Sequence, residues 1–587
     1  IMRPAGPVRP SRAGDPTADA EGGAIVMSAR QGALRWAVLL LVVVAGCSKH
    51  GMTVNARGNM TMNTPVQPPV TTMVVDRQPA GVATQGRIAL VDVDGLLVNV
   101  ETGSALAQGE NPVALFRERL DAVACDPCAR AVVLRIHSHG GGVTACDIMR
   151  HDLVAFKRRT GLPVVACLMD VGTGGAYYLA SAADKVIMHP LGGVLIPGVS
   201  GRMTFLKGTL EKLGIEPEAS RHGRYKSAVE QFTEDSLTAP NREQMQALVD
   251  ALYDEFISAT AAGRNITPEQ METLVDQAFF MAHEAKASGL VDTLCYDDEL
   301  DSLVARELGH ARDKEHQFRS RKPFKDVWSA GSRIALIYAN GSIATGESRT
   351  DFLTGNQIIG STTLVNAIRQ ARKDRRVKSV LLRVDSPGGD GLASDEIWRE
   401  LELTRAKKPL VVSMGGVAAS GGYYISCNAE RVFASPASLT GSIGVFSLRL
   451  VTEGLYNKLG VRRQSVKRGE HADLTDARAM TPEEDSIVQA QIDYFYGQFV
   501  NKVAQGRRMT PEQVDSVAQG RVWSGRDAFR VGLVDSLGGL KAALDYARDR
   551  ARLGSDSEIE FYPKPKSAFG FDLDEFKNRL LLRLRPW

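Results

Sequence analysis

The 587-residue sequence predicts an α/β protein of two tandem domains, each a mostly parallel sheet covered by helices. One observation behind this prediction is an internal repeat, because the letters RIAL at residues 87–90 return at residues 333–336, 246 positions later. The other is the alternation of short apolar runs with amphipathic segments. For example, SRIALIYANG at 332–341 predicts a strand and TTLVNAIRQARKD at 362–374 predicts a helix. This alternation is typical of a parallel sheet with helical layers.

The repeat continues along most of the chain. KLG at residues 212–214 returns at 458–460, again 246 positions later. Further on the offset slips to 243, because TPEQ at 267–270 returns at 510–513. A self-similarity that persists over this length indicates two copies of one structural unit.

The repeat and the composition of the remaining segments together predict the domain boundaries. The linker is charged and carries a proline. The C-terminal tail has apolar residues at helical spacing with arginines between them, which suits packing on a neighbouring subunit or on a membrane surface. The predicted segments are an upstream segment with a signal peptide at 1–47, a flexible tether at 48–85, the first repeat at 86–310, a linker at 311–331, the second repeat at 332–550 and a tail at 551–587.

The N-terminal region predicts export. Arg30 and Arg35 precede an apolar stretch at 36–44 that is too short to span a bilayer comfortably. The letters VAGC that end at Cys47 resemble a bacterial lipobox, in which the cysteine is lipidated and becomes the new N-terminus. Met27 is then the expected start. The alternative is an uncleaved signal anchor, and either reading places the bulk of the chain outside the cytoplasm at a membrane.

Charge and cysteine content exclude two classes of partner. A formal net charge of +3, with no run of lysine and arginine, excludes a nucleic-acid-binding stripe. Cys125 and Cys128 form a CxxC pair without a second pair, so we expect no metal site. Whether this pair forms a disulfide stays open. The remaining cysteines of the two repeats lie mostly in apolar runs and are expected to be buried thiols: Cys146, Cys167, Cys295 and Cys427.

Ser420 is the candidate nucleophile. It follows an apolar run that begins at Val411 and stands between Ala419 and the pair Gly421 and Gly422, where little steric cover surrounds a hydroxyl. The carboxyl ends of parallel strands are where active sites gather in such folds, and this turn lies at one of them. The alternative is a purely structural turn between a strand and a helix.

Each repeat serves as a control for the other. The first repeat has Gly174 at the position of Ser420, with Thr173 as a weak substitute. A serine nucleophile needs a base, and a lysine serves when burial lowers its pKa. Lys226 of the first repeat lies opposite Ala472 of the second. The second repeat has the serine without the lysine, and the first has the lysine without the serine. The comparison therefore predicts one Ser-Lys dyad assembled from both repeats.

Four motifs in order resemble the long, tandem form of the signal peptide peptidase A family, serine proteases of the Clp protease and crotonase superfamily. They are RYKSAVE at 224–230, SPGG at 386–389, AASGGYYIS at 418–426 and LTGSIGVF at 439–446. The resemblance implies two tandem Clp/crotonase-like domains. It also implies that Ser420 is the nucleophile and Lys226 the general base, with Ser442 orienting the lysine.

The resemblance further implies a bowl-shaped homotetramer that faces the periplasm of a bacterial cell envelope. Its substrates would be signal peptides left in the membrane after export, together with other unfolded or hydrophobic peptides, and no cofactor is expected. The geometry of such a turn predicts an oxyanion hole from the N–H groups of Gly421 and Gly389. Gln231 departs from the family pattern, which has proline after the glutamate.

Several rival interpretations remain. A crotonase-type acyl-CoA enzyme shares the fold but needs no Ser-Lys pair and would not be exported. A Clp-type triad is disfavoured, because the second repeat has His471 as its single histidine and places it more than fifty residues after Ser420. His222 and Lys467 are rival bases, each more simply explained as a solvated polar residue. A non-catalytic or differently specific scaffold at the cell envelope is the alternative function.

Overall fold

The computed structural model divides into two compact units, residues 1–68 and 69–587. The first unit contains an antiparallel strand pair, β1 (Gly51–Val54) with β2 (Met60–Asn63). The predicted signal peptide, including Cys47, and the tail after residue 563 lie outside the described residues. Side chains are described for 88–99, 111–169, 171–296, 299, 303, 332–350, 357–554 and 557–563, and the backbone also for 51–54, 60–63, 70–74, 87 and 314–318.

The first repeat is built around a seven-stranded sheet in the order β12-β8-β6-β5-β4-β3-β13. Its central strands are buried along nearly their whole length, as expected of parallel strands covered on both faces. The parallel strands are β4 (Arg87–Asp94), β5 (Ala129–His137), β6 (Val164–Leu168), β8 (Lys185–Met188) and β12 (Thr293–Leu294), and the antiparallel edge is β3 (Val70–Val74) with β13 (Lys314–Phe318).

The second repeat has the same parallel arrangement in an eight-stranded sheet. Its main path is β23-β21-β19-β18-β14-β25, and β20 and β24 branch from β19. Only β23 pairs in the antiparallel direction. The strands are β14 (Arg333–Asn340), β18 (Val377–Ser386), β19 (Leu410–Ala419), β20 (Arg431–Ala434), β21 (Leu439–Gly441), β23 (Val522–Ser524), β24 (Ser536–Leu537) and β25 (Glu558–Tyr562).

Helices follow the strands in both repeats, which confirms the predicted fold class. Each repeat has one 26-residue helix that begins with threonine at the N-cap and proline in the first turn, a strong start signal. The first repeat contains α2 (Pro112–Ala124), α3 (Val143–Thr160), α4 (Gly174–Ala180), α7 (Ala239–Arg264), α8 (Pro268–Gln277) and α9 (Ala282–Ala287). The second contains α11 (Ser361–Lys373), α12 (Gly391–Arg405), α13 (Gly421–Tyr424), α15 (Pro482–Arg507), α16 (Pro511–Val517), α17 (Gly525–Arg530) and α18 (Leu540–Arg550).

Strand pairing shows where the two repeats differ in length. The first residue of β4, Arg87, pairs with Ala129 of β5, whereas its counterpart Arg333 of β14 pairs with Val377 of β18. The offset between the repeats is therefore 246 from β4 to β14 and 248 from β5 to β18. The turn that follows this strand consequently aligns 386–390 with 138–142.

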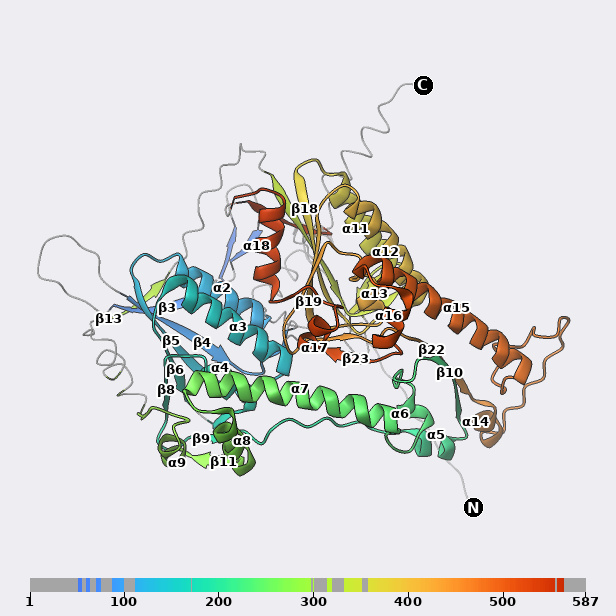
Figure 1. The fold of residues 1–587 in the computed structure, drawn as a ribbon, viewed down its shortest axis with the longest axis horizontal. Coiled ribbons are helices and arrows are strands. Elements are labelled where there is room, and N and C mark those ends of the chain that lie inside the picture. Colours follow the sequence, from blue (N-terminus) through green and yellow to red (C-terminus); the bar gives the residue numbers. More distant parts are fainter. Residues whose placement is uncertain are drawn as a thin grey trace, which may run out of the picture. The chain divides into compact units, whose positions relative to one another are not determined.

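One strand from each repeat joins the two halves. The strand β10 (Glu216–His222) of the first repeat pairs antiparallel with β22 (Val445–Val451) of the second over seven residue pairs (Figure 1). Three short helices flank this ribbon: α5 (Lys207–Leu213), α6 (Glu230–Thr233) and α14 (Glu453–Lys458). The loop with Lys226 follows β10 directly, so the ribbon brings this loop of the first repeat to the second.

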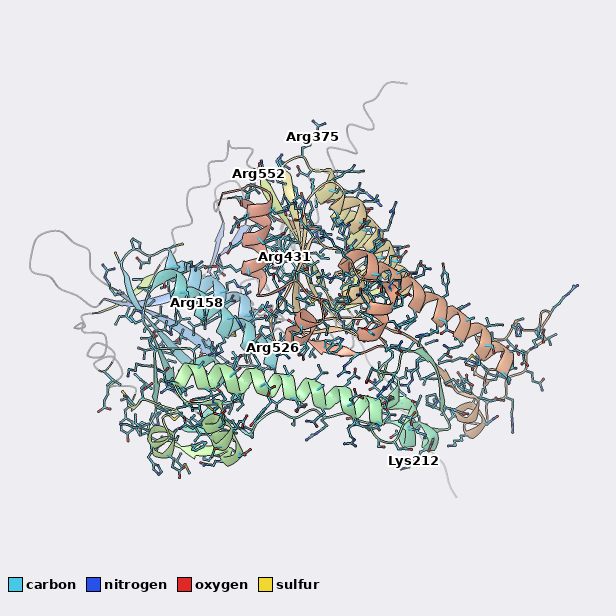
Figure 2. The ribbon with its side chains drawn as sticks, in the orientation of Figure 1. Arg158, Lys212, Arg375, Arg431, Arg526 and Arg552 are labelled. Atoms are coloured by element: carbon cyan, nitrogen blue, oxygen red, sulfur yellow. The ribbon has the colours of Figure 1, made fainter. Side chains whose placement is uncertain are left out.

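Side-chain contacts also cross between the repeats. Arg526 of α17, labelled in Figure 2, forms an ion pair with Glu255 of α7. Small sheets complete each half: β7 (Val171–Thr173), β9 (Gly193–Leu195) and β11 (Phe279–Met281) in the first, and β15 (Ser342–Ala344), β16 (Arg349–Thr350) and β17 (Gln357–Gly360) in the second. Within the part of the chain that is described, no helix combines the length and apolar character needed to cross a bilayer.

Candidate active site

Ser420 stands on a strained turn between β19 and α13. Its backbone has φ +53° and ψ −120°, a conformation that residues other than glycine rarely adopt. The turn is held by two backbone hydrogen bonds: the N–H of Ser420 donates to the carbonyl of Gly441 at 2.9 Å, and Tyr424 donates to the carbonyl of Ser420 at 2.8 Å. Such strain at a turn is common where a side chain must be presented for chemistry.

The residues beneath Ser420 make the turn rigid. A Cβ at Gly422 would lie 2.5 Å from the carbonyl oxygen of Ser386, so only glycine fits there. Tyr423 is fully buried, and its hydroxyl donates to the carbonyl of Leu533 at 2.8 Å. The candidate nucleophile therefore rests on a packed base rather than on a mobile loop.

Lys226 reaches Ser420 from the other repeat. Its Nζ lies within hydrogen-bond distance of three oxygens: 3.1 Å from Ser420 Oγ and 2.9 Å from both the side-chain and the backbone oxygen of Ser442. Ser442 has φ +50°, which turns both of its oxygens toward the amine. The structure thus brings together the three residues that the sequence analysis proposed for the dyad and its support.

The surroundings of Lys226 favour its neutral form. The side chain is 3% exposed, and burial lowers its pKa from the usual 10.5 to about 7. Among the described residues no carboxylate forms an ion pair with it. The nearest aromatic contact is the ring of Phe446, whose centroid is 5.9 Å from Nζ. An amine in this state can accept a proton near neutral pH.

The loop of Lys226 is anchored by a buried carboxylate. Glu230 is 1% exposed and accepts hydrogen bonds from Arg221, Thr238 and Asn241. Arg221 also donates to the carbonyl of Lys226 at 3.1 Å. Gln231, where the family pattern has proline, donates to the carbonyl of Ala228 and makes no contact with the dyad.

The turn after β18 lies against the Ser420 turn. Gly388 and Gly389 have φ +103° and +151°, and a Cβ on Gly388 would lie 2.7 Å from the backbone nitrogen of Gly421. Ile343 fixes the turn by donating to the carbonyl of Gly388 at 2.8 Å. Within the described part of the chain, the N–H groups of Gly389 and Gly421 donate to no other group. Both are free to bind a carbonyl oxygen, as the oxyanion-hole prediction requires.

The first repeat keeps this scaffold without its reactive groups. Gly140 packs on Gly175 as Gly388 packs on Gly421, because a Cβ there would lie 3.1 Å from the Gly175 nitrogen. Gly174 stands where the second repeat has Ser420, and the Thr173 hydroxyl donates to the carbonyl of His139. Thr173 therefore does not replace the missing nucleophile.

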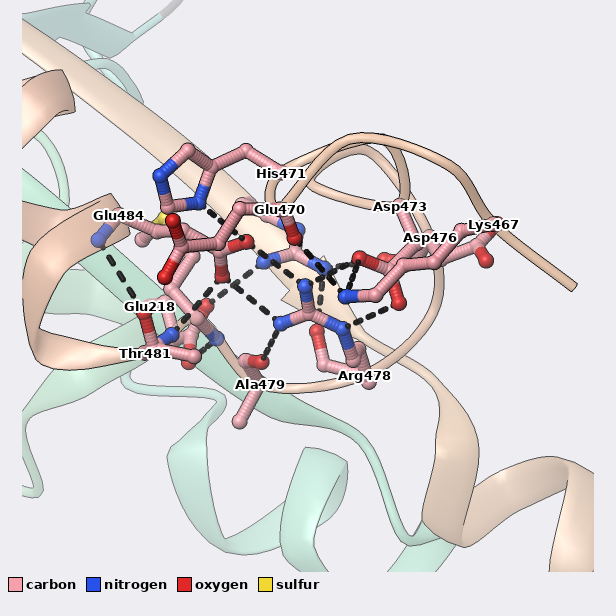
Figure 3. A network of polar contacts seen from close by, with 12 residues as sticks. Glu218, Lys467, Glu470, His471, Asp473, Asp476, Arg478, Ala479, Thr481 and Glu484 are labelled. Carbon is pink, nitrogen blue, oxygen red and sulfur yellow. Dashed lines mark hydrogen bonds and ion pairs between the residues drawn. The ribbon is translucent and has the colours of Figure 1, made fainter. Parts of the chain in front are cut away.

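The rival bases are engaged elsewhere. His222 stacks on Tyr496, with ring centroids 3.9 Å apart, and its Nδ1 lies 2.7 Å from Asp493. Lys467 and His471 belong to the polar network of Figure 3, where Lys467 donates to Asp473 at 2.8 Å. No histidine among the described residues bonds to the Ser420 hydroxyl, so the Clp-type triad is not formed.

Arg478 is the centre of that network. It bridges Asp473 and Glu484 at 2.7 Å each, and the neighbouring Met480 donates from its backbone to Glu218 of the first repeat at 3.0 Å (Figure 3). Ala472, the counterpart of Lys226, is an exposed residue of the same loop. The arrangement is structural and holds the loop after β22 against β10.

No group of three or more histidine, cysteine or acidic side chains in the described segments could hold a metal ion. Cys125 and Cys128 are free thiols, so the CxxC pair forms no disulfide in this structure. Cys125 is exposed and Cys128 half-buried, and Cys146, Cys167, Cys295 and Cys427 are buried, as their apolar surroundings predict.

Sequence reasoning missed one part of the site. The turn at residues 518–521 contacts both the Lys226 loop and the Ser442 loop. The sequence did contain a sign of this turn, because the Gln519-Gly520 pair of the second repeat has no counterpart in the first. The contact itself is tertiary and could not be predicted from the pattern.

Comparisons with known proteins identify the family of the chain. Peptidase family S49 matches the chain twice, at residues 156–309 and 402–554, once in each repeat. Protease 4 of Salmonella typhi is 37% identical over 430 residues, which cover 71% of this chain and 68% of that protein. Protease 4 of Haemophilus influenzae is 32% identical over 452 residues, covering 74% and 72% respectively.

A plant protein is similar over the same length. Serine protease SPPA, chloroplastic, of Arabidopsis thaliana is 33% identical over 445 residues, which cover 74% of this chain and 65% of that protein. The matched region thus spans about two thirds of the length of these relatives. The double family match confirms the tandem repeat.

Proposed function

The chain belongs to peptidase family S49 and is a serine protease, and from this premise we propose that it is an endopeptidase with a Ser-Lys dyad split between its repeats. Ser420 would be the nucleophile and Lys226 the general base. The observation that carries the proposal is the 3.1 Å distance between Lys226 Nζ and Ser420 Oγ. The lowered pKa of Lys226, about 7, supports its role as a base.

Catalysis would begin with neutral Lys226. As Ser420 Oγ attacks the scissile carbonyl, its proton passes to Nζ and a tetrahedral intermediate forms. The N–H groups of Gly389 and Gly421 would stabilise the negative oxygen. The two oxygens of Ser442, each 2.9 Å from Nζ, would accept hydrogen bonds from the new ammonium group.

The second half of the reaction reverses these roles. The ammonium of Lys226 would donate its proton to the leaving amine, which frees the C-terminal part of the substrate and leaves an acyl-enzyme on Ser420. Water would then attack the ester while Lys226 again accepts a proton. Release of the acid restores the hydroxyl and the neutral amine.

Signal peptides and other hydrophobic or unfolded peptides are the proposed substrates. The resemblance to the signal peptide peptidase A family supports this choice, as does the apolar surface beside the dyad. Phe446 is 41% exposed, and the centroid of its ring lies 5.9 Å from Lys226 Nζ. Such a side chain suits an extended apolar peptide better than a charged one.

The proposed location is a bacterial cell envelope, with the chain anchored in a membrane by lipidated Cys47 and facing the periplasm. The support is the sequence before residue 48, with its basic start, short apolar stretch and lipobox-like VAGC. Cys47 lies outside the described residues.

A homotetramer is the proposed assembly, and the repeat supplies an argument for a ring. Within the chain, the Thr144 hydroxyl of the first repeat donates to the carbonyl of Ala437 of the second at 3.1 Å. The counterpart of Ala437 is Leu191, 87% exposed, and the counterpart of Thr144 is Leu392. Leu191 and Leu392 are therefore exposed, and they could form a second, equivalent contact between two chains.

The joining ribbon repeats this pattern. The segment that corresponds to β22 is 199–205, and the one that corresponds to β10 is 462–468. Neither forms a strand, and the second is exposed throughout. If these segments met as β10 and β22 do, chains would associate head to tail, and such a contact forms a ring where the rotation between chains closes.

Labelling with a fluorophosphonate tests the catalytic proposal. Wild-type protein should be labelled at Ser420, while Ser420→Ala and Lys226→Ala should lose labelling at neutral pH and Thr173→Ala should retain it. A folded wild-type protein that resists the probe and cleaves no peptide would instead support the alternative, a non-catalytic scaffold.

A further inference from the structure

The turn at residues 518–521, between α16 and β23, lies directly against the backbone of Lys226. The carbonyl of Gln519 accepts a hydrogen bond from the N–H of Tyr225 at 2.8 Å. A Cβ on Gly520 would lie 2.6 Å from the nitrogen and 2.7 Å from the Cα of Lys226. Only a residue without a side chain allows this approach.

The other side of the turn faces the loop of Ser442. Gly520 donates to the carbonyl of Ile443 at 2.7 Å, and Ser442 donates to the carbonyl of Arg521 at 2.7 Å. A Cβ on Gly444 would lie 2.8 Å from Gly520 Cα and 3.1 Å from Lys226 Cδ. The turn is thus wedged between the two loops whose side chains meet at Ser420.

The turn holds a costly conformation. Gln519 has φ +50° and Gly520 has φ +78°. A left-handed conformation is unfavourable for glutamine and persists when the surroundings enforce it. Here the side-chain amide of Gln519 donates to Asp515 at 2.6 Å and to the Tyr496 hydroxyl at 3.3 Å, and its oxygen accepts from the N–H of Arg224 at 3.4 Å.

The first repeat makes the same helix-to-strand connection without this turn. At the offset of 243, Gln519 and Gly520 correspond to Asp276 and Gln277, the last two residues of α8, and the chain then passes through Ala278 into β11. The connection itself therefore does not require a Gln-Gly pair. The pair occurs in the copy that carries Ser420 and touches Lys226.

We propose that Gln519 and Gly520 are positioning residues that hold the Lys226 amine at Ser420 and Ser442 and keep water from its stem. This inference rests on the proposed Ser-Lys function. Neither residue touches a reacting atom, and both act through the Lys226 and Ser442 loops. Loosening the turn would let the amine move and gain water, which favours the ammonium form and removes the base near neutral pH.

The experiment compares Gln519→Ala and Gly520→Ala with a matched glycine control. Gly532 has φ +81° and no atom within 4 Å of an added Cβ, so Gly532→Ala adds backbone strain without a clash. The readouts are kcat and KM for a peptide substrate and the rate of fluorophosphonate labelling, each measured from acid to alkaline pH. Circular dichroism checks folding.

Gly520→Ala should lower kcat on the order of a hundredfold, because displacing a reacting group by about 1 Å costs that much, while KM changes little. Gln519→Ala should lower kcat less. In both variants the acid limb of the pH profile should move to higher pH, with partial recovery in alkaline buffer. Gly532→Ala should keep the wild-type profile.

If Gly520→Ala does not fold, Gln519→Ala alone tests the positioning role. A folded Gln519→Ala with the wild-type pH midpoint would overturn the positioning role, whether or not its kcat falls. An unreactive Ser420 in the wild-type protein is a different result, because it would overturn the proposed function itself.

Discussion

Lys226 is a cation-forming side chain that the fold keeps from both water and carboxylates. The Nζ is left with three oxygen neighbours, one from Ser420 and two from Ser442. Desolvation penalises the charged form, so burial lowers the pKa of Lys226 to about 7. Because a buried ammonium is costly, the neutral amine is well populated near pH 7, where it can accept a proton.

The pH dependence of turnover follows from this pKa. Below about pH 7 Lys226 is protonated and cannot accept the Ser420 proton, so kcat/KM should rise through pH 7 and level off above it. A peptide-cleavage assay across this range measures the midpoint. An acid limb centred near pH 4 would contradict the assignment of Lys226 as the base.

Ser442 should affect the rate through the same amine. Ser442→Ala removes one of the two oxygens at 2.9 Å from Nζ, and a hydrogen bond to a charged group contributes about 1.5–3 kcal/mol. We expect kcat to fall on the order of tenfold to a hundredfold with little change in KM. Wild-type kcat in a folded Ser442→Ala variant would rule out this orienting role.

At the scale of the element, two glycine turns and one strained serine turn form the floor of the site. The turn after β18 is tied to Ile343, and a Cβ on Gly389 would lie 2.0 Å from the Ile343 carbonyl oxygen. The N–H of Gly389 is therefore held by packing on both sides of its turn. A fixed donor stabilises developing charge without reorganising during the reaction.

Gly389→Ala should displace this donor. The expected loss in kcat is on the order of a hundredfold or more, the cost of removing one oxyanion-hole donor. Gly391→Ala is the matched control, because its Cβ would meet Phe495 at an ordinary 3.8 Å. Equal kinetics for the two variants in a peptide-cleavage assay would exclude Gly389 from the oxyanion hole.

The elements also show how far sequence comparison reaches. The order of strands and helices could be predicted from hydrophobic period, and the repeat from recurring motifs. Comparison of the two copies singled out Ser420 and Lys226 as candidates, because each stands opposite a residue without a functional group. The shift to an offset of 248 was established by the strand pairing, although LR at 134–135 already returns at 382–383 in the sequence. The role of Gln519 could not be predicted either, since it depends on a contact between loops about three hundred residues apart in sequence.

At the scale of the whole molecule, the residues that join the two repeats have counterparts in the other repeat, and these counterparts are exposed. Thr144 and Ala437 meet within the chain, whereas their counterparts Leu392 and Leu191 are exposed. Large apolar side chains at such positions are typical of interfaces. The same duplication that separates Ser420 from Lys226 therefore also supplies the surfaces for the proposed ring of chains.

Charges at this second joint should separate the chains. Leu191→Asp and Leu392→Asp are each expected to lower the mass measured by sedimentation from a tetramer toward a monomer, because an unpaired carboxylate is costly to bury. Phe529→Asp, at an apolar position of similar exposure to Leu392, is the control. A tetramer that persists in both leucine variants would contradict the proposed ring contact.

The proposed division of the dyad between two halves of one chain has a consequence during synthesis. Ribosomes complete Lys226 long before Ser420, and the turn that touches both loops ends at Arg521. A nascent chain, or a fragment cut between the repeats, would lack one of the two proposed catalytic groups. On this proposal the protease would stay inactive until both repeats have been made and have folded together.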